Sequence, residues 1–201
     1  MMMMTRRGIW LGLGALLVVV AVGLGLYQQQ LRDRANGDPQ GGPIELPSTE
    51  GEFSLSQLDD DQLAVVFFGY TWCPDVCPMS LAVVRQVMER LDPEQRRRVV
   101  PLMVSVDPER DTLARLEEYL AFFGDAFIGA TGSQEVLEEL TQRYGVIWRK
   151  VETPDSAMDY TIDHSASLFL VDREGEIRRR VLHSPTSGPL QAALEQALAE
   201  G

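Results

Sequence analysis

The sequence contains few of the side chains that most metal-binding and nucleic-acid-binding functions require. Its 201 residues include only two cysteines and two histidines. Two thiolates are too few for a closed tetrahedral zinc site built on sulfur. Basic residues are also scarce, because 18 Lys and Arg stand against 30 Asp and Glu, for a net charge of −12. Such a surface repels a phosphate backbone, so we expect no nucleic-acid partner.

One long uncharged stretch lies near the N-terminus. Residues 9–27, IWLGLGALLVVVAVGLGLY, carry no charged side chain. As a helix they would extend roughly 28 Å, close to the hydrocarbon thickness of a bilayer. Two arginines precede the stretch and favour a cytoplasmic N-terminus, although two more follow it. We therefore expect residues 1–8 in the cytoplasm, a single-pass anchor at 9–27 in the inner membrane, and the remainder on the periplasmic side.

A cleaved signal peptide is the alternative to an anchor. The apolar run is longer than the core of a usual signal peptide, and no A-x-A pattern follows it. No cysteine lies near its end, so we expect no lipid-modified N-terminus. Residues 28–43 are rich in Gly, Pro and polar side chains, which is typical of a tether. The globular domain is therefore expected to span residues 44–201.

Within this domain, strand-like and helix-like patterns alternate. Leu63–Tyr70 and Val99–Asp107 are continuous apolar runs of strand length, as in strands buried on both faces. The segment between them has apolar residues at three-to-four spacing, which predicts a helix and a βαβ unit. Two more helices, with Asp111 and Ser133 as candidate N-caps, then a β-hairpin and a final amphipathic helix complete the order. We predict an α/β fold in which a mixed sheet carries helices on both faces.

Both cysteines lie in FFGYTWCPDVCPMSL, between the first apolar strand and the following helix. There, unpaired N–H groups and the helix dipole favour the thiolate form of Cys73 and Cys77. Two residues four apart in a helical turn face the same side, so the sulfurs can hold one ion or form a disulfide. Buried thiols without function are a third interpretation, which their isolated spacing disfavours. Redox and metal-binding functions therefore both stay open.

A metal ion held by two thiolates needs a further ligand, and soft Cu(I) suits such a set. His164 directly precedes a predicted buried strand, at the end of a loop, so it can point from the same end of the sheet as the cysteines. His183 follows a predicted edge strand, where a solvated histidine is the usual case. His164 is therefore the better candidate, although a lone histidine near a strand is more often structural.

Four segments extend this interpretation: FFGYTWCPDVCPMSL, VSVDPERD, GATGS and DHSASLFLVDREGEI. In order and spacing they resemble the Sco/SenC family of copper-binding, membrane-anchored thioredoxin-like proteins, from about residue 44 to the C-terminus. The resemblance implies a thioredoxin-like fold with Cys73, Cys77 and His164 as copper ligands. Family members help to assemble the dinuclear CuA centre of cytochrome c oxidase, as copper donors or as thiol reductants of the oxidase subunit.

The resemblance thus implies a chaperone that receives copper, as Cu(I) or Cu(II), from an upstream donor and passes it to the oxidase subunit that carries CuA. The alternative is a thiol-disulfide oxidoreductase, in which the Cys73 and Cys77 couple depends on an upstream reductant and reduces that subunit without copper. Ordinary thioredoxins have C-x-x-C and an opposing cis-proline, whereas this chain has C-x-x-x-C and no proline from Asp155 to Ser184.

Two carboxylates stand beside the candidate ligands in the sequence. Asp75 lies between the cysteines and Asp163 precedes the histidine, so each is a candidate for a supporting hydrogen bond or an oxygen ligand. The alternative interpretations are that Asp75 only places negative charge at a helix start and that Asp163 is only a solvated loop residue. Asp107, at the end of a central strand, is expected to cap or shape a loop. A static-disulfide binding module and a peroxiredoxin-like activity are weaker functional alternatives.

Overall fold

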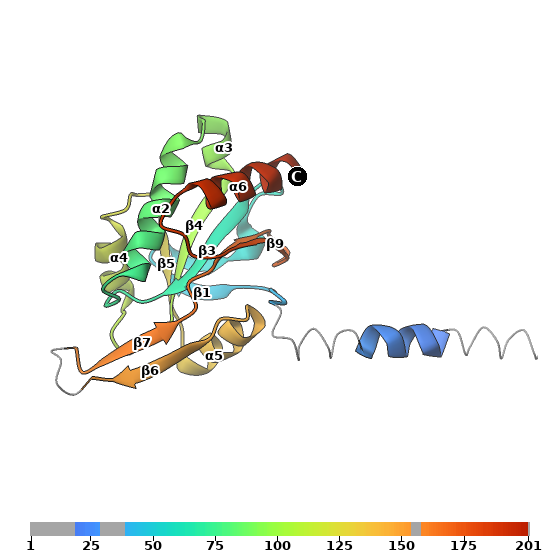
Figure 1. The fold of residues 1–201 in the computed structure, drawn as a ribbon, viewed down its shortest axis with the longest axis horizontal. Helices are drawn as coiled ribbons and strands as arrows, with labels where there is room; N and C mark the ends of the chain where they lie inside the picture. The colour runs from blue at the N-terminus through green and yellow to red at the C-terminus, as the bar shows by residue number, and fades with distance from the viewer. Residues whose placement is uncertain (1–18, 29–38, 154–157, 201) are drawn as a thin grey trace, which may run out of the picture. The chain divides into compact units, whose positions relative to one another are not determined.

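The computed structural model describes residues 19–28, 39–153 and 158–200 (Figure 1). The chain divides into two compact units, Met1–Asp38 and Pro39–Gly201. In the first unit, residues 19–28 are helical with exposed side chains. Among the described helices, none combines the length and apolar character needed to cross a membrane. The predicted anchor lies partly outside the described residues, as do the predicted cytoplasmic segment and most of the tether.

The second unit is built on a seven-stranded mixed sheet with the order β2-β1-β5-β4-β3-β8-β9 (Figure 1). In that order the strands span Gly51–Ser54, Glu45–Ser48, Ile128–Ala130, Val99–Ser105, Leu63–Gly69, Leu168–Val171 and Ile177–Val181. β3, β4 and β5 are parallel, and the outer strands on both sides are antiparallel to their neighbours. The predicted mixed sheet is therefore confirmed, with the two apolar runs as its central strands.

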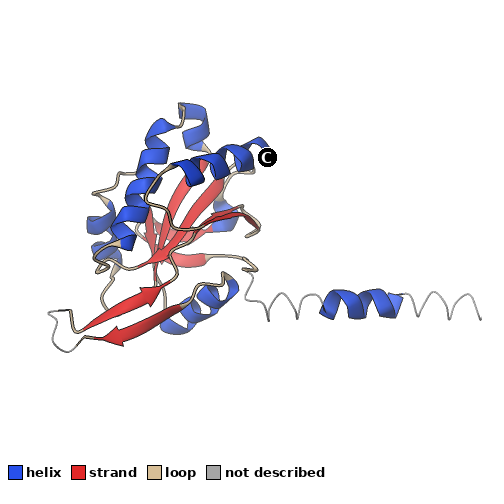
Figure 2. Ribbon diagram, viewed as in Figure 1, coloured by secondary structure: helices blue, strands red, loops and turns tan. Residues whose placement is uncertain are grey.

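Helices cover both faces of this sheet, as predicted (Figure 2). On one face lie α2 (Val76–Arg90), α4 (Leu113–Leu120) and α6 (Gly188–Glu200), with α2 against α6 and α4 against β5. On the other face α5 (Gln134–Arg143) ends at Tyr144, whose ring packs on Phe68 and Phe169. The short α3 (Pro93–Arg97) lies between α2 and β4, and a 3-10 turn at Leu55–Gln57 lies between β2 and β3.

A separate two-stranded sheet, the β6–β7 hairpin, was not predicted. Its strands are β6 (Trp148–Glu152) and β7 (Tyr160–His164), paired antiparallel. The burial of β6 shows no strict alternation, and its sequence WRKVE lacks the apolar periodicity that identifies a strand. His164 was expected at the end of a loop and is instead the last residue of β7, so the hairpin decides where its ring lies.

The predicted N-cap at Asp111 is wrong. Thr112 caps α4, since its side chain accepts the N–H of Arg115. Asp111 is fully buried and accepts three hydrogen bonds: the N–H of Thr71 at 2.9 Å, the Thr71 hydroxyl at 2.6 Å and the Ser105 hydroxyl at 2.6 Å. A buried carboxylate needs several donors, and these donors would otherwise be buried without acceptors. Asp111 therefore ties the segment before Cys73 to the end of β4.

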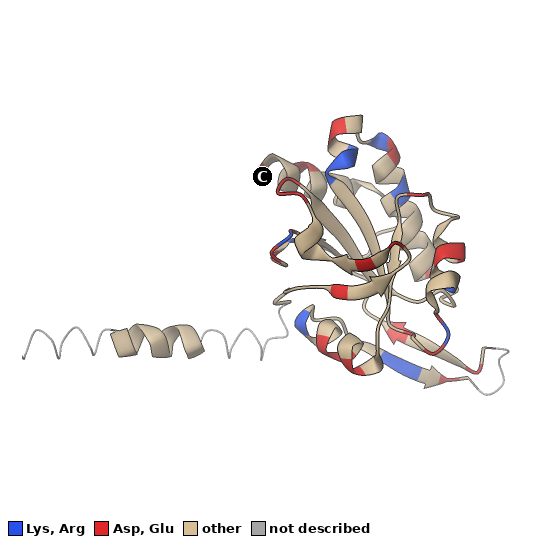
Figure 3. Ribbon diagram, turned by 180° about the vertical axis from the view of Figure 1, so that it is seen from behind, with Lys and Arg blue, Asp and Glu red and all other residues tan. Residues whose placement is uncertain are grey.

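The surface of this unit carries charged side chains of both signs. The exposed side of α5 carries Glu135, Glu138 and Glu139, whereas β6 carries Arg149 and Lys150 (Figure 3). Both of these basic side chains are paired, with Asp163 at 3.1 Å and with Glu109 at 2.8 Å respectively.

Candidate metal centre

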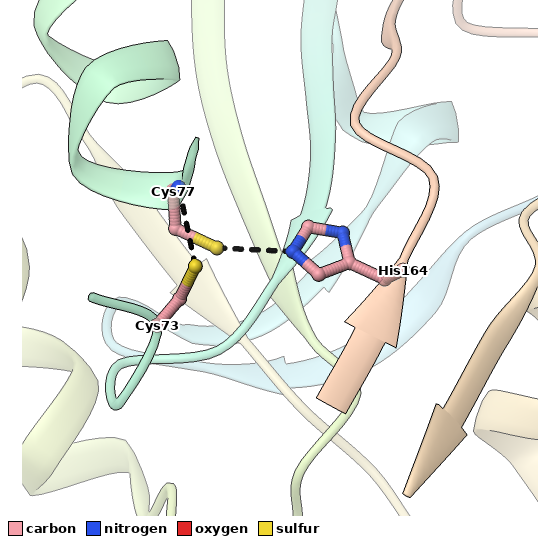
Figure 4. Close-up of side chains that lie close together, drawn as sticks. All are labelled: Cys73, Cys77 and His164. Carbon is pink, nitrogen blue, oxygen red and sulfur yellow. Dashed lines mark hydrogen bonds between the residues drawn. The ribbon is translucent and has the colours of Figure 1, made fainter. Parts of the chain in front are cut away.

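Cys73, Cys77 and His164 lie together beyond the C-terminal end of β3 (Figure 4). Their potential ligand atoms are all within 4.8 Å of one another. The Cys77 Sγ is 3.2 Å from the His164 Nε2, and the Cys77 N–H donates to the Cys73 Sγ at 3.4 Å. The three residues singled out from the sequence are thus one cluster, although 87 positions separate Cys77 from His164.

The two cysteines were expected in the first turn of one helix, and this is right for Cys77 alone. α2 begins at Val76 with Asp75 at its N-cap, so Cys73 precedes the helix. Proline disfavours the helical conformation of the residue before it, and Pro74 follows Cys73. Cys73 therefore bends back from a turn so that its sulfur faces the first N–H groups of the helix.

Gly69, the last residue of β3, makes room for the buried sulfur. A Cβ atom at this position would lie 2.9 Å from the Cys77 Sγ and 2.6 Å from the ring of Phe67. Both separations are shorter than ordinary van der Waals contact, so any larger residue would displace the sulfur or the ring. Sequence reasoning missed this role. The available signal was a glycine that closes an apolar strand, where another group often approaches the backbone closely.

His164 is contacted by two aromatic rings and by a backbone carbonyl. The rings of Phe67 and Tyr70 stand edge-on to its imidazole, with centroids 6.0 and 5.9 Å away. Its Nδ1 lies 3.3 Å from the carbonyl oxygen of Ser165. A proton on Nδ1 donates to that oxygen, which leaves the Nε2 lone pair directed at the sulfurs.

The pKa values of the two thiols move in opposite directions. A hydrogen bond from Cys77 is the largest influence that lowers the pKa of Cys73 to about 4, helped by the His164 ring and by the N–H groups of Asp75 and Cys77. Burial raises the pKa of Cys77 far above its usual range, and the neighbouring Cys73 adds to this. Without metal, the pair therefore holds one thiolate and one thiol at neutral pH.

The other candidates lie outside this group of ligand atoms. Asp75 is exposed and makes no side-chain capping bond, and Asp163 is exposed and paired with Arg149. His183 is partly buried rather than solvated, with its Nδ1 3.1 Å from the Ser80 hydroxyl. Among the described residues, the candidate metal group comprises the two cysteines and His164 alone.

Asp107 does shape a loop, and it does so together with residues that sequence reasoning did not single out. It is buried, pairs with Arg110 at 2.6 Å and accepts the Tyr160 hydroxyl at 2.7 Å. Tyr70 accepts the N–H of Ile162 at 3.2 Å. Both contacts join the β6–β7 hairpin to the segments that follow β3 and β4.

The donor set fits a soft metal ion. If an ion binds with bonds of about 2.0–2.3 Å to nitrogen and sulfur, its three ligand atoms lie about 3.8 Å from one another. The three ligand atoms here lie within 4.8 Å of one another, so only a small movement is needed. Two sulfurs and one imidazole disfavour Mg²⁺ and Ca²⁺, which prefer oxygen ligands. These features together define a thioredoxin-like domain with a soft-metal site: the mixed sheet, two cysteines at a strand-to-helix junction, and a histidine from a hairpin.

The chain belongs to the SCO1/SenC family, whose model matches residues 32–199. A SCO2-like protein of Rickettsia conorii is 35% identical over 136 residues, which are 68% of this chain and 66% of that protein. The structure of Arabidopsis thaliana ScoI with copper bound is 30% identical with a TM-score of 0.72, covering 81% of this chain and 99% of that one. Bradyrhizobium japonicum ScoI with copper bound is 34% identical with a TM-score of 0.68, covering 78% and 98%.

Proposed function

We propose that this protein is a membrane-anchored copper chaperone that delivers copper to the CuA site of cytochrome c oxidase. The observation that carries the proposal is the convergence of Cys73, Cys77 and His164, with ligand atoms within 4.8 Å. Membership of the Sco/SenC family and the copper held by two solved relatives support copper as the cargo. An upstream copper donor and the oxidase subunit are the partners that this function requires.

The anchor and the location belong to the same proposal. The apolar stretch at residues 9–27 is long enough to span the inner membrane. The two arginines before it favour a cytoplasmic N-terminus and therefore a periplasmic domain. The parts are then residues 1–8 in the cytoplasm, 9–27 in the membrane, 28–43 as tether and 44–201 as the copper-binding domain.

The site's own groups account for binding and release. Cys77 lies at the closed side of the cluster with no exposed surface, Cys73 is 8% exposed, and His164 is partly buried. An ion held by all three can therefore be approached on the side of Cys73 and His164. Binding displaces the proton of Cys77, whose pKa is raised, so copper affinity falls as the pH falls.

Copper titration of the reduced full-length chain in detergent tests the ligand set. His164→Ala should weaken copper binding by at least about tenfold and alter the thiolate-to-copper charge-transfer absorption. His183→Ala is the matched control, since it removes the other histidine and should leave binding unchanged. Unchanged binding in His164→Ala would refute the three-ligand site.

CuA occupancy of the oxidase subunit tests the delivery step in cells. A deletion strain should lose occupancy, and neither Cys73→Ser nor His164→Ala should restore it. If His164→Ala restores occupancy and Cys73→Ser does not, the chain acts on the thiols of the subunit rather than carrying its copper.

The unequal thiols favour reduction as a second candidate function. The Cys73 thiolate attacks one sulfur of a disulfide in the oxidase subunit and releases the other sulfur as a thiolate. The Cys77 thiol then gives up its proton and attacks Cys73, which frees the second sulfur of the subunit and leaves a Cys73–Cys77 disulfide. Two electrons pass to the subunit, and an upstream thiol reductant restores the pair.

Alkylation of Cys73 across the pH range tests this candidate. Because the pKa of Cys73 is about 4, its thiolate fraction is nearly complete above pH 5, so the alkylation rate should stay flat from about pH 5 to 8. Cys77→Ala removes the hydrogen bond that lowers the pKa most, so the rate should then fall toward acid pH. A wild-type rate that rises about tenfold per pH unit would contradict the assignment.

A further inference from the structure

We infer that Arg110 is a positioning residue that holds the β6–β7 hairpin, and with it His164, against the part of the domain that carries the cysteines. The inference rests on the proposed function, since it assigns Arg110 a role in building the same site. Arg110 is not itself a ligand, because its guanidinium stays protonated and offers no lone pair to a metal ion.

The β6–β7 hairpin depends on such side-chain contacts because no backbone strand pairing is described between it and the main sheet. Its two strands pair with each other, and in the described part of the chain no strand pairing joins them to the seven-stranded sheet. The orientation of β7 therefore depends on side chains that bridge it to the body. His164, at the end of this strand, inherits whatever orientation the hairpin has.

Arg110 makes the bridge with several contacts at once. Its Nε donates to the Asp107 carboxylate at 2.6 Å. Its Nη1 donates to the backbone carbonyl oxygens of Met158 at 3.1 Å and Tyr160 at 3.0 Å. The guanidinium carbon lies 3.5 Å from the centroid of the Tyr160 ring, within the range of a cation–π contact. The start of β7 is thus fixed to the loop after β4, four residues before the ligand.

The same guanidinium also faces the segment that carries the cysteines. Its carbon lies 5.8 Å from the ring of Trp72, which precedes Cys73, and 5.8 Å from the ring of Tyr70, which stands edge-on to His164. Its Nη2 is buried and has no hydrogen-bond acceptor among the described residues. Aromatic rings lie around this partly buried cation. Arg110 therefore contacts neighbours of the cysteine ligands and neighbours of the histidine ligand.

Lysine cannot reproduce this set of contacts. The planar fork of arginine reaches a carboxylate, two carbonyl oxygens and a ring in fixed directions, whereas lysine offers a single point charge on a flexible stem. Arg110→Lys therefore keeps the charge and removes the simultaneous attachment. Arg115→Lys is the matched control, because Arg115 also lies 5.7 Å from the Trp72 ring but bonds to Thr71 and Glu118 rather than to the hairpin.

The first measurement uses the copper-free full-length chain in detergent. Arg110→Lys should accelerate amide hydrogen exchange across residues 160–164 and leave exchange in β3 and β4 unchanged, whereas Arg115→Lys should leave both unchanged. Uniform acceleration throughout the domain would overturn the inference, because the residue would then act on general stability. Should Arg110→Lys not fold, Tyr160→Phe, which removes one bond of the same cluster, must show the same local change or the inference fails.

The second measurement is copper affinity in a double-mutant cycle with His164→Ala. Arg110→Lys should lower affinity about tenfold and weaken the nitrogen hyperfine signal of the Cu(II) form, because a supporting residue that orients a ligand has an effect of this size. With His164 already replaced, Arg110→Lys should change affinity less than about twofold. An equal loss in both backgrounds, or no loss in either, overturns the inference.

The single variants separate this failure from failure of the proposed function. If His164→Ala leaves copper affinity unchanged, the three-ligand site is wrong and the inference fails with it. If His164→Ala weakens binding but Arg110→Lys does not, the copper site stands and only the role of Arg110 is refuted.

Discussion

The cysteines and His164 reach the same site from regions of different construction. The cysteine side continues directly from β3, all of whose residues are buried. Asp111 anchors the segment between β3 and Cys73 with three buried hydrogen bonds. The histidine side is a two-stranded sheet attached by side chains, among them those of Arg110, Tyr70, Tyr160 and Trp148.

This difference separates two kinds of perturbation. A change on the cysteine side disturbs the core, so it should lower the free energy of unfolding of the whole domain. A change on the histidine side should first loosen the β6–β7 hairpin, because local opening costs least where few buried contacts hold an element. Four substitutions test whether the two sides behave differently.

The largest loss of stability is expected from Asp111→Asn. The amide keeps the shape but replaces one acceptor oxygen by a donor. If Oδ1 is replaced, the Thr71 hydroxyl loses its acceptor, and if Oδ2 is replaced, the Thr71 N–H and the Ser105 hydroxyl lose theirs. We expect the free energy of unfolding to fall by about 3 kcal/mol, measured by urea denaturation with reduced thiols. A fall within error of zero would mean that the cysteine side is not anchored as described.

The next largest effect is expected on copper affinity, from Cys77→Ser. The substitution is nearly isosteric but replaces a soft sulfur with a hydroxyl, so copper affinity should fall by more than about 100-fold. His164→Ala should cost less, because both sulfurs remain. Competition titrations with a Cu(I) chelator measure both, and the reverse ranking would contradict a site anchored on the cysteines.

Gly69→Ala should have an intermediate effect, on both the stability of the core and the affinity of the copper site. The added methyl group would overlap the Phe67 ring and the Cys77 sulfur, at a cost of about 1–3 kcal/mol in unfolding free energy. The displaced sulfur should also weaken copper binding. Gly188→Ala is the control, since a Cβ there meets no atom within 4 Å. Equal behaviour of the two variants would refute the close approach of Gly69 to the sulfur.

Tyr160→Phe should give the smallest effect on the domain as a whole. It removes the hydroxyl that donates to Asp107 at 2.7 Å, at a cost of about 1 kcal/mol. Hydrogen exchange should accelerate within the β6–β7 hairpin more than in β3. If exchange accelerates equally in both, the hairpin is not a separately attached element and the comparison of the two sides fails.

The two sides also differ in how well the sequence predicts them. The central strands, the helices on both faces and the position of Cys77 follow from apolar runs, three-to-four spacing and helix-end residues, which are local signals. Ser133 at the N-cap of α5 is a similar case. The local pattern around Cys73 predicted a helical turn, and Pro74 overrides it.

The histidine side depends on contacts between distant segments, which no local pattern encodes. β6 lacks apolar alternation, and the hairpin partners of Arg110 lie about 50 positions away in the chain. The helix cap predicted at Asp111 was wrong for a related reason. Its sequence context fits a helix cap, but its carboxylate instead accepts hydrogen bonds from buried donors on Thr71 and Ser105. Residue choice alone could indicate His164 as a candidate, whereas its place on β7 required the structure.

The 87 positions between Cys77 and His164 have a consequence for folding. A chain that has formed β3 and α2 already presents both thiols, while the imidazole arrives only when the hairpin has formed and docked. Until then, the pair is exposed to oxidation without its third partner. Tight copper binding would therefore indicate that the late, long-range part of folding is complete, and a misfolded copy would bind copper weakly.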